Sequence, residues 1–340
     1  MSSPTNKKTD LKYSRERGGG LAWLSVLLAM IAVFGVAMAN RQDIYDWIRL
    51  RGYDPPPAVV KLADQDGMKD YTRHLFYLNR PQILSTVTAF RQSCTQSENT
   101  IVLGCYHPGD DGIYIYDVQD PELAGVEQVT AAHEVLHAIY ERLSDSERSS
   151  LDKQLEDFYE HGLKDQRVRD EIKLYQKNEP GEVVNEMSCI FGTEVAELPD
   201  GLEAYYSRYF EDRSAIVAYS RQYESEFTRR EAAIKQYDSQ LDSLKQRIDA
   251  AKADLQNRQA GLESKQAQLN AAKASGDTDA YNAGVPEYNR LVDEYNAGIS
   301  STKLLVARYN RIVEARNDVA RELASLAEAL DTRLPHETTR

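Results

Sequence analysis

The segment from Thr130 to Leu143 reads TAAHEVLHAIYERL, and most of its residues other than the two histidines are apolar. An apolar body of this kind is typical of a helix that is buried in a protein core. Residues at positions i and i+4 lie one turn apart on the same helix face. His133 and His137 have this spacing, so both imidazoles can reach a single metal ion. The segment therefore predicts a buried helix that carries two metal ligands.

The chemistry of this motif also depends on the glutamate between the histidines. Zinc binds imidazole nitrogen and carboxylate oxygen in a tetrahedron, and catalytic zinc keeps one position for water. Zinc lowers the pKa of that water, and a neighbouring carboxylate can take its proton and pass it to a leaving amine. Glu134 directly follows His133 and fits this role of general base. The motif predicts Zn2+ as cofactor; the alternative is two histidines that bind no metal.

A zinc site of this kind requires a third protein ligand. Residues 138–147 read AIYERLSDSE, which excludes the close third histidine of the metzincin pattern. Downstream, GEVVNEMSCIFGTEVAEL offers Glu186, whose apolar neighbours predict burial, and a buried carboxylate needs a cationic partner. Glu194, about two helical turns further on, is the second candidate. His161 is a poorer candidate because EHGLKDQRVRD is expected to be exposed.

HEVLH, followed 49 residues later by Glu186 within NEMSCIFGTE, resembles the gluzincin class of zinc metallopeptidases. The similarity covers roughly residues 95–210 and is closest to compact, minigluzincin-like members. It implies a zincin-like metallopeptidase fold with zinc on His133, His137 and Glu186, and with Glu134 as general base. Gluzincins commonly stabilise the oxyanion with a tyrosine or histidine. LEAYYSRYF leaves the choice open among three tyrosines, Tyr205, Tyr206 and Tyr209.

The same resemblance implies an edge strand just before the HEVLH helix. GIYIYDV, at 112–118, alternates isoleucine with tyrosine, which is the period of a strand with one buried face. A peptide could pair with such a strand and lie across the metal. The alternative is an ordinary hairpin strand.

Residues 58–212 mix helical and strand patterns and predict an α+β domain, with a small sheet or hairpin and active-site helices. TIVLGCY and GIYIYDV flank HPGDDG, which favours a hairpin turn. Helices are expected in MKDYTRHLFYLNR and PQILSTVTAFRQSC, and around 127–143, 146–162 and 182–197.

Residues 213–332 have a different character, rich in charge and alanine. Apolar residues at alternating spacings of three and four predict two heptad runs that form an antiparallel α-helical coiled-coil hairpin. Glycines and Pro286 in KASGDTDAYNAGVP place its tip near 274–286. Arg258, Lys265, Thr302 and Arg316 are polar residues in the predicted seam. The hairpin is either a spacer or an arm for a protein partner or self-association, and 333–340 is expected to be a disordered tail.

The N-terminal part predicts a membrane anchor. LAWLSVLLAMIAVFGVAMA, at 21–39, has 19 residues without a charge, close to the roughly 20 that cross a bilayer. Five basic residues precede it, which places 1–20 in the cytoplasm and the catalytic domain outside the cell membrane, as a single-pass protein. Cleavage after a secretion signal is the alternative. Residues 40–57 end in DPPPA and are expected to form a linker.

The net charge of the chain limits its possible binding partners, and its cysteines indicate the cellular compartment. The formal net charge of -13 argues against nucleic acid, because phosphate binding needs a basic surface. Cys94 and Cys105 bracket a short segment that suits a hairpin closed by a disulfide, with two reduced thiols as the alternative. Such a disulfide indicates an oxidising compartment, and Cys189 stays free.

These expectations together predict a membrane-anchored, exported zinc metallopeptidase that hydrolyses a protein or peptide substrate. One alternative is a non-catalytic cell-surface interaction protein that uses the coiled-coil hairpin. Another is a cell-envelope hydrolase of peptidoglycan peptides, although no wall-binding motif is present.

Overall fold

The computed structural model describes residues 1–2, 19–94, 102–109 and 112–333. The chain divides into two compact units, Met1–Pro55 and Pro56–Arg340. The predicted tails fall almost entirely outside the described residues, as do Asp110 and Asp111 of the expected hairpin turn and the start of TIVLGCY.

The first unit contains helix α1 (Gly19–Ala39) and helix α2 (Arg41–Leu50). Helix α2 occupies a large part of the segment for which the sequence indicated a linker. Among the described residues, no single helix meets the length and hydropathy of a membrane span. The pair Val26–Ala39 and Arg41–Leu50, bent by 67°, meets them together.

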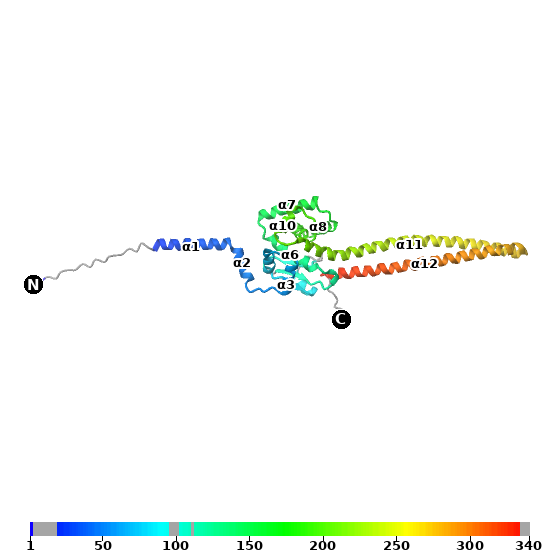
Figure 1. The fold of residues 1–340 in the computed structure, drawn as a ribbon, viewed down its shortest axis with the longest axis horizontal. Helices are drawn as coiled ribbons and strands as arrows, with labels where there is room; N and C mark the ends of the chain where they lie inside the picture. The colour runs from blue at the N-terminus through cyan, green and yellow to red at the C-terminus, as the bar shows by residue number, and fades with distance from the viewer. Residues whose placement is uncertain (3–18, 95–101, 110–111, 334–340) are drawn as a thin grey trace. The chain divides into compact units, whose positions relative to one another are not determined.

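The second unit is mostly helical, with a small three-stranded sheet and two long C-terminal helices (Figure 1). The expected helices around 127–143, 146–162 and 182–197 are confirmed, whereas α3, α8 and α10 were not anticipated. In chain order the elements are α3 (Pro57–Gln65), α4 (Asp70–Leu78), β1 (Gln82–Leu84), α5 (Val87–Ser93), β2 (Gly104–His107), β3 (Gly112–Tyr116), η1 (Pro121–Leu123), α6 (Val126–Glu141), α7 (Asp145–His161), α8 (Gln166–Asn178), α9 (Val183–Thr193), α10 (Asp200–Tyr206), α11 (Arg213–Ser275) and α12 (Thr278–Leu330).

The sheet has the strand order β1-β3-β2, with β3 antiparallel to β2 and parallel to β1. Two expectations are therefore wrong. PQILSTVTAFRQSC is helical only from Val87, because Gln82–Leu84 pairs with β3 as a strand. Because β1 and β2 both pair with β3, the segment GIYIYDV forms the central strand and not the expected edge strand. The edge strand that follows β3 in the sheet is β2.

The disulfide between Cys94 and Cys105 is confirmed, with the two Cα atoms 5.9 Å apart. It connects the end of α5 to β2 and packs in a cluster with Val87, Phe90 and Tyr116. Cys189 is free and buried, as expected. The disulfide therefore ties the edge strand to the α5 segment.

Helix α6, which carries HEVLH, lies in the core of this unit. Ala131, Ala132, Val135 and Leu136 have no exposed surface. The helix packs against α9 and α4 and against both β2 and β3. The prediction of a buried helix is confirmed.

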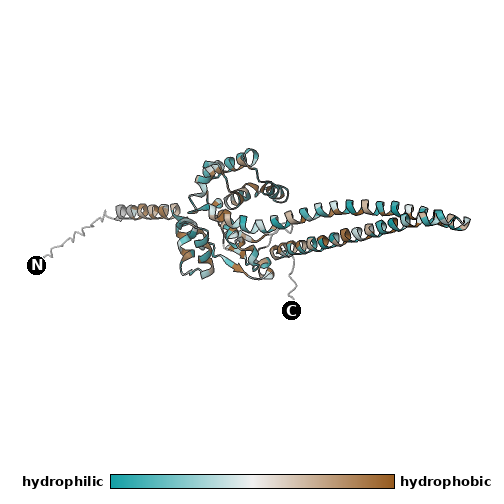
Figure 2. Ribbon diagram, turned by 45° about the vertical axis from the view of Figure 1, so that its right-hand side comes forward, coloured by the Kyte–Doolittle hydropathy of each residue, from teal (hydrophilic) through white to brown (hydrophobic). Residues whose placement is uncertain are grey.

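The two long helices form the antiparallel hairpin that the heptads predicted, as Figures 1 and 2 both show. Gly276, with a φ of 78°, ends α11 in the left-handed conformation that glycine tolerates. Asp277 then caps α12 by accepting a hydrogen bond from the Ala280 N–H at 2.9 Å. The tip is therefore tighter than expected, and Pro286 lies inside α12 and not in the loop.

Two glycines let the hairpin helices approach closely. A Cβ atom on Gly284 would lie 2.8 Å from Leu269, and one on Gly298 would lie 2.9 Å from Leu255. Both glycines end a YNAG sequence, and the two copies are separated by two heptads. The repeat thus provides holes for leucines of α11. Across the same seam, Arg316 pairs with Asp238 at 3.0 Å.

The base of the hairpin is fastened to the rest of the unit by Arg230 of α11. Its side chain is 7% exposed and lies 2.6 Å from Glu122 of η1, 2.7 Å from Glu226 and 3.3 Å from Glu322 of α12. Leu326 packs beside this group against Leu123 and Val126, at the start of α6. The coiled coil is therefore continuous with the packing around the HEVLH helix.

We expect Arg230→Met to lower the free energy of unfolding by about 1–3 kcal/mol, because the buried guanidinium bonds three carboxylates. Arg290→Met is the matched control, because Arg290 also pairs with two glutamates but is 54% exposed. Its removal should cost much less stability, because solvent screens exposed ion pairs. Denaturant unfolding followed by circular dichroism measures both values, and equal losses would contradict the special role of Arg230.

Candidate metal centre

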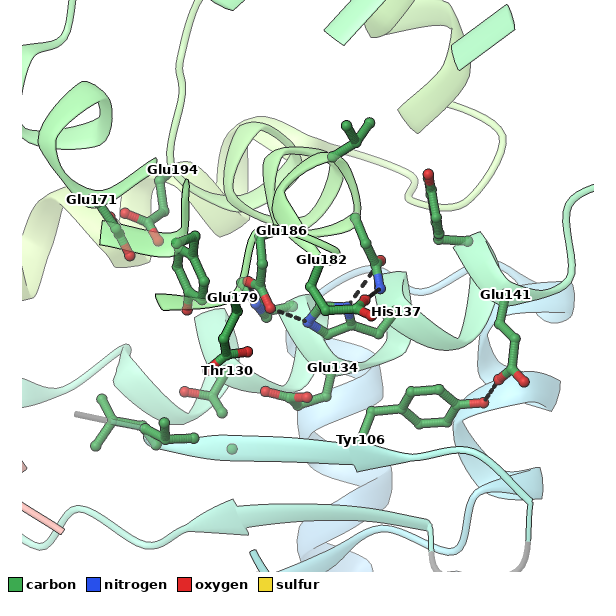
Figure 3. Close-up of a pocket in the computed structure, with 18 of the residues that line it drawn as sticks. Tyr106, Thr130, Glu134, His137, Glu141, Glu171, Glu179, Glu182, Glu186 and Glu194 are labelled. Atoms are coloured by element: carbon green, nitrogen blue, oxygen red, sulfur yellow. Dashed lines mark hydrogen bonds and ion pairs between the residues drawn. The ribbon is translucent and has the colours of Figure 1, made fainter. Parts of the chain in front are cut away.

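Two helices bring the predicted ligands together. His133 and His137 project from α6, and Glu186 projects from α9, which packs against α6 (Figure 3). The Nε2 atom of His133 lies 3.4 Å from Oε2 of Glu186, and Nε2 of His137 lies 3.6 Å from Oε1. All three side chains are largely buried, with exposed fractions between 12% and 17%.

These distances agree with a shared tetrahedral ion. Donor atoms about 2.0–2.2 Å from one zinc ion stand roughly 3.3–3.6 Å from each other. The Oε2 atom of Glu186 is buried and has no hydrogen-bond partner. A buried carboxylate oxygen without a partner is costly, and a cation between the three side chains would satisfy it. The residues therefore fit a zinc ion.

Asn185 orients one of the imidazoles. Its Oδ1 lies 3.0 Å from Nδ1 of His137, and its amide nitrogen donates to Glu182 at 3.2 Å. An amide oxygen only accepts, so Nδ1 carries the proton and Nε2 keeps a free lone pair. Outer partners of this kind fix the tautomer of ligating histidines. Sequence reasoning missed Asn185, although it directly precedes Glu186.

Electrostatics inside the site reflect burial and the neighbouring charges. Burial lowers the pKa of His137, which leaves a neutral imidazole at neutral pH. Burial acts in the same direction on His133, but the Glu186 carboxylate outweighs it and raises the pKa of His133 to about 9. Burial would raise the pKa of Glu186, yet the two histidines hold it below its usual value. The carboxylate is thus kept ionised by positive charge.

Glu134 lies where a general base would be needed. Its side chain lines the same cavity as the two histidines, and the residue is 6% exposed. Burial raises the pKa of its carboxyl to about 8. Strand β2 approaches it closely at Gly104, where a Cβ atom would lie 2.6 Å from the Glu134 carboxylate and 2.4 Å from Thr130. Glycine is therefore required for β2 to lie against the HEVLH helix.

Cys189 is a further donor near the centre. Its sulfur and the donor atoms of His133 and His137 all lie within 4.8 Å of one another. A second group of donors, at Cys94, Cys105 and His107, has the same proximity, but both of its cysteines are in the disulfide. The chain therefore has groups that can bind a metal ion. In the group that contains His133 and His137, Cys189 is an alternative to Glu186 as the third ligand.

The other candidate ligands are not among the donors that lie close to both imidazoles. Glu194 ends α9 and pairs with Arg167 at 2.6 Å. His161 is exposed at the end of α7, 3.9 Å from Asp157. Neither side chain contacts the two imidazoles.

The three tyrosines considered for the oxyanion do not line the cavity. Tyr206 donates its hydroxyl hydrogen to the Ser188 carbonyl at 2.7 Å, and the rings of Tyr205 and Tyr209 pack 5.1 Å apart. Tyr175 of α8 lines the cavity instead, and it contributes to holding the pKa of Glu186 below its usual value. Helix α8 carries no motif, so no sequence signal pointed to this tyrosine.

The centre opens into a cleft of about 650 Å³. Gly104 and Tyr106 of β2 contribute to one wall, and most of the other lining residues belong to α6, α8 and α9 (Figure 3). Among the described strands, β2 pairs only with β3, so its other edge faces away from the sheet. The Tyr106 hydroxyl donates to Glu141 at one end of this cleft. An elongated ligand can lie along β2 beside the two histidines.

Comparison of the chain with protein-family models, with curated proteins and with solved structures finds no match.

Proposed function

We propose that this protein is a zinc-dependent peptidase. The observation that carries the proposal is the convergence of His133, His137 and Glu186 at separations of 3.4 and 3.6 Å, beside the buried carboxyl of Glu134. Two imidazoles and one carboxylate are the ligand set of zinc peptidases in which zinc activates water and polarises the scissile carbonyl.

In this proposal the side chains divide the work. Glu134 takes the proton from the attacking water and passes it to the leaving nitrogen, a role for which a buried carboxyl with a raised pKa is suited. Asn185 holds His137 in the tautomer that directs Nε2 toward Glu186. Tyr175 lines the same cleft as Glu186 and affects the pKa of that carboxyl, and it is our candidate for stabilising the oxyanion.

The edge of β2 that faces away from β3 would align the substrate. An extended peptide that pairs with this edge passes the HEVLH helix at Gly104, where no side chain separates the backbone from Glu134. Main-chain pairing of this kind holds a peptide without selecting its sequence. The substrate class therefore includes proteins or peptides that present an extended segment.

The test is hydrolysis of a mixed peptide library by the purified full-length protein. Zinc removal by a chelator should abolish cleavage, and added Zn2+ should restore it. A zinc-loaded protein that cleaves no peptide would favour the alternative of a cell-surface interaction protein.

We further propose that residues 21–39 anchor the protein and that the second unit lies outside the cell membrane. The disulfide between Cys94 and Cys105 supports an oxidising compartment. Extraction of membranes with alkaline carbonate tests the anchor, because an anchored chain stays in the pellet. A protein recovered in the supernatant would contradict it.

A further inference from the structure

The cleft carries far more negative than positive charge. Seven glutamates line it, whereas Arg148 is the single arginine and no lysine contributes, among the residues that the structure describes. A zinc ion would offset two of these charges. A cleft lined by one sign of charge concentrates ligands of the opposite sign.

Two of these glutamates lie together at one end of the cleft, where Glu171 of α8 is beside Glu194 at the end of α9 (Figure 3). Arg167 reaches both carboxylates, at 3.2 Å and 2.6 Å, and lies 3.7 Å from Glu224 of α11. One guanidinium thus serves three carboxylates. Within this group of four side chains, three carboxyl groups share one cation.

Burial makes the imbalance costly. The Glu194 side chain is 8% exposed, and its Oε2 accepts no aligned hydrogen bond although Arg167 is close. Burial and the neighbouring Glu194 raise the pKa of Glu171 to about 8. A buried carboxylate is stabilised when a cation arrives to pair with it.

An aromatic ring stands at the same end. Tyr223 of α11 lines the cleft, and burial followed by the charge of Glu194 raises the pKa of its hydroxyl. Carboxylates beside an aromatic ring provide both ion-pair and cation–π contacts for an ammonium or guanidinium group.

We infer that the end of the cleft at Glu171 and Glu194 binds a lysine or arginine side chain of the substrate. This inference rests on the proposed peptidase function. Glu171 is then a specificity-determining residue. Pairing along β2 accepts many sequences, and Glu171 adds a preference for substrates with a basic side chain.

The test compares fluorogenic peptides that differ only in lysine or acetyl-lysine, placed in turn at each position around the scissile bond. We expect lysine to raise kcat/KM roughly 30-fold or more at one position, because acetylation removes one partner of a buried charge pair. Glu171→Gln should reduce this ratio toward one. Glu141→Gln, at the opposite end of the cleft, is the matched control and should keep the ratio.

A ratio near one at every position, or an equal ratio in wild type and Glu171→Gln, would overturn the inference. Binding is measured separately by fluorescence anisotropy of the same labelled peptides with the full-length Glu134→Gln protein. Tighter binding of the lysine peptide that depends on Glu171 would support the cation site even if no peptide is cleaved. Equal binding of both peptides would refute the site, whereas failure of hydrolysis alone would refute the peptidase proposal.

Discussion

Replacement of Glu134 by glutamine is expected to lower kcat for peptide hydrolysis by about 10²–10⁴-fold while zinc stays bound. Glutamine has nearly the same shape but cannot accept a proton. Glu134 is 6% exposed and lies beside the two histidines, so a base from the solution cannot readily reach the site and replace it. Kinetics with a cleaved peptide, together with metal analysis of the same sample, measure the two effects.

Glu182→Gln is a suitable control, because Glu182 also lines the cleft but is not one of the donors that face the two imidazoles, and it accepts a hydrogen bond from Asn185. It should lose much less activity than Glu134→Gln. Full activity in the Glu134→Gln protein would remove the general base from the mechanism, and a simultaneous loss of zinc would show that Glu134 acts on the metal site itself.

The second large effect concerns zinc content. We expect one zinc ion per chain in the wild-type protein and none in His137→Ala or Glu186→Gln, because each variant removes a ligand. Asn185→Ala should retain the ligands but bind zinc about 10–100-fold more weakly, because it frees the His137 tautomer. Metal analysis after dialysis against a competing chelator measures these differences.

Cys189→Ser is the decisive control for the third ligand. Cys189 lies in the same donor group, but Glu186 faces the Nε2 atoms of both histidines. We therefore expect Cys189→Ser to retain its zinc. Loss of zinc in Cys189→Ser and retention in Glu186→Gln would replace the carboxylate by the thiolate. Circular dichroism of each variant shows whether the fold survives.

Several features were predictable because local geometry determines them. The spacing of His133 and His137 places both on one helix face whatever the rest of the fold does. The heptads from 213 onward predicted the hairpin, and the separation of Cys94 and Cys105 suited the disulfide that the structure contains. Glu186 could be preferred because its apolar neighbours implied burial, and the structure brings it to the two histidines.

The sequence could not order the strands. Gln82–Leu84 is too short and too close to a helix to be recognised, yet its parallel pairing makes β3 central and leaves β2 beside the cleft. Pro286 was read as a helix breaker, but packing of α12 against α11 keeps the helix continuous through it. In both cases contacts with distant segments outweigh the local preference.

The sequence by itself therefore determined the helix that carries the two histidines, the coiled coil and the cysteine pair, since the repeat of a helix or the length of a loop relates residues that are neighbours in the chain. Only the tertiary structure decided that Asn185 orients His137, that Tyr175 and not the three tyrosines considered for the oxyanion lines the cleft, and that Arg167 pairs with both Glu171 and Glu194. These groups come from different helices, and their proximity depends on how those helices pack, for which a short stretch of sequence carries no signature.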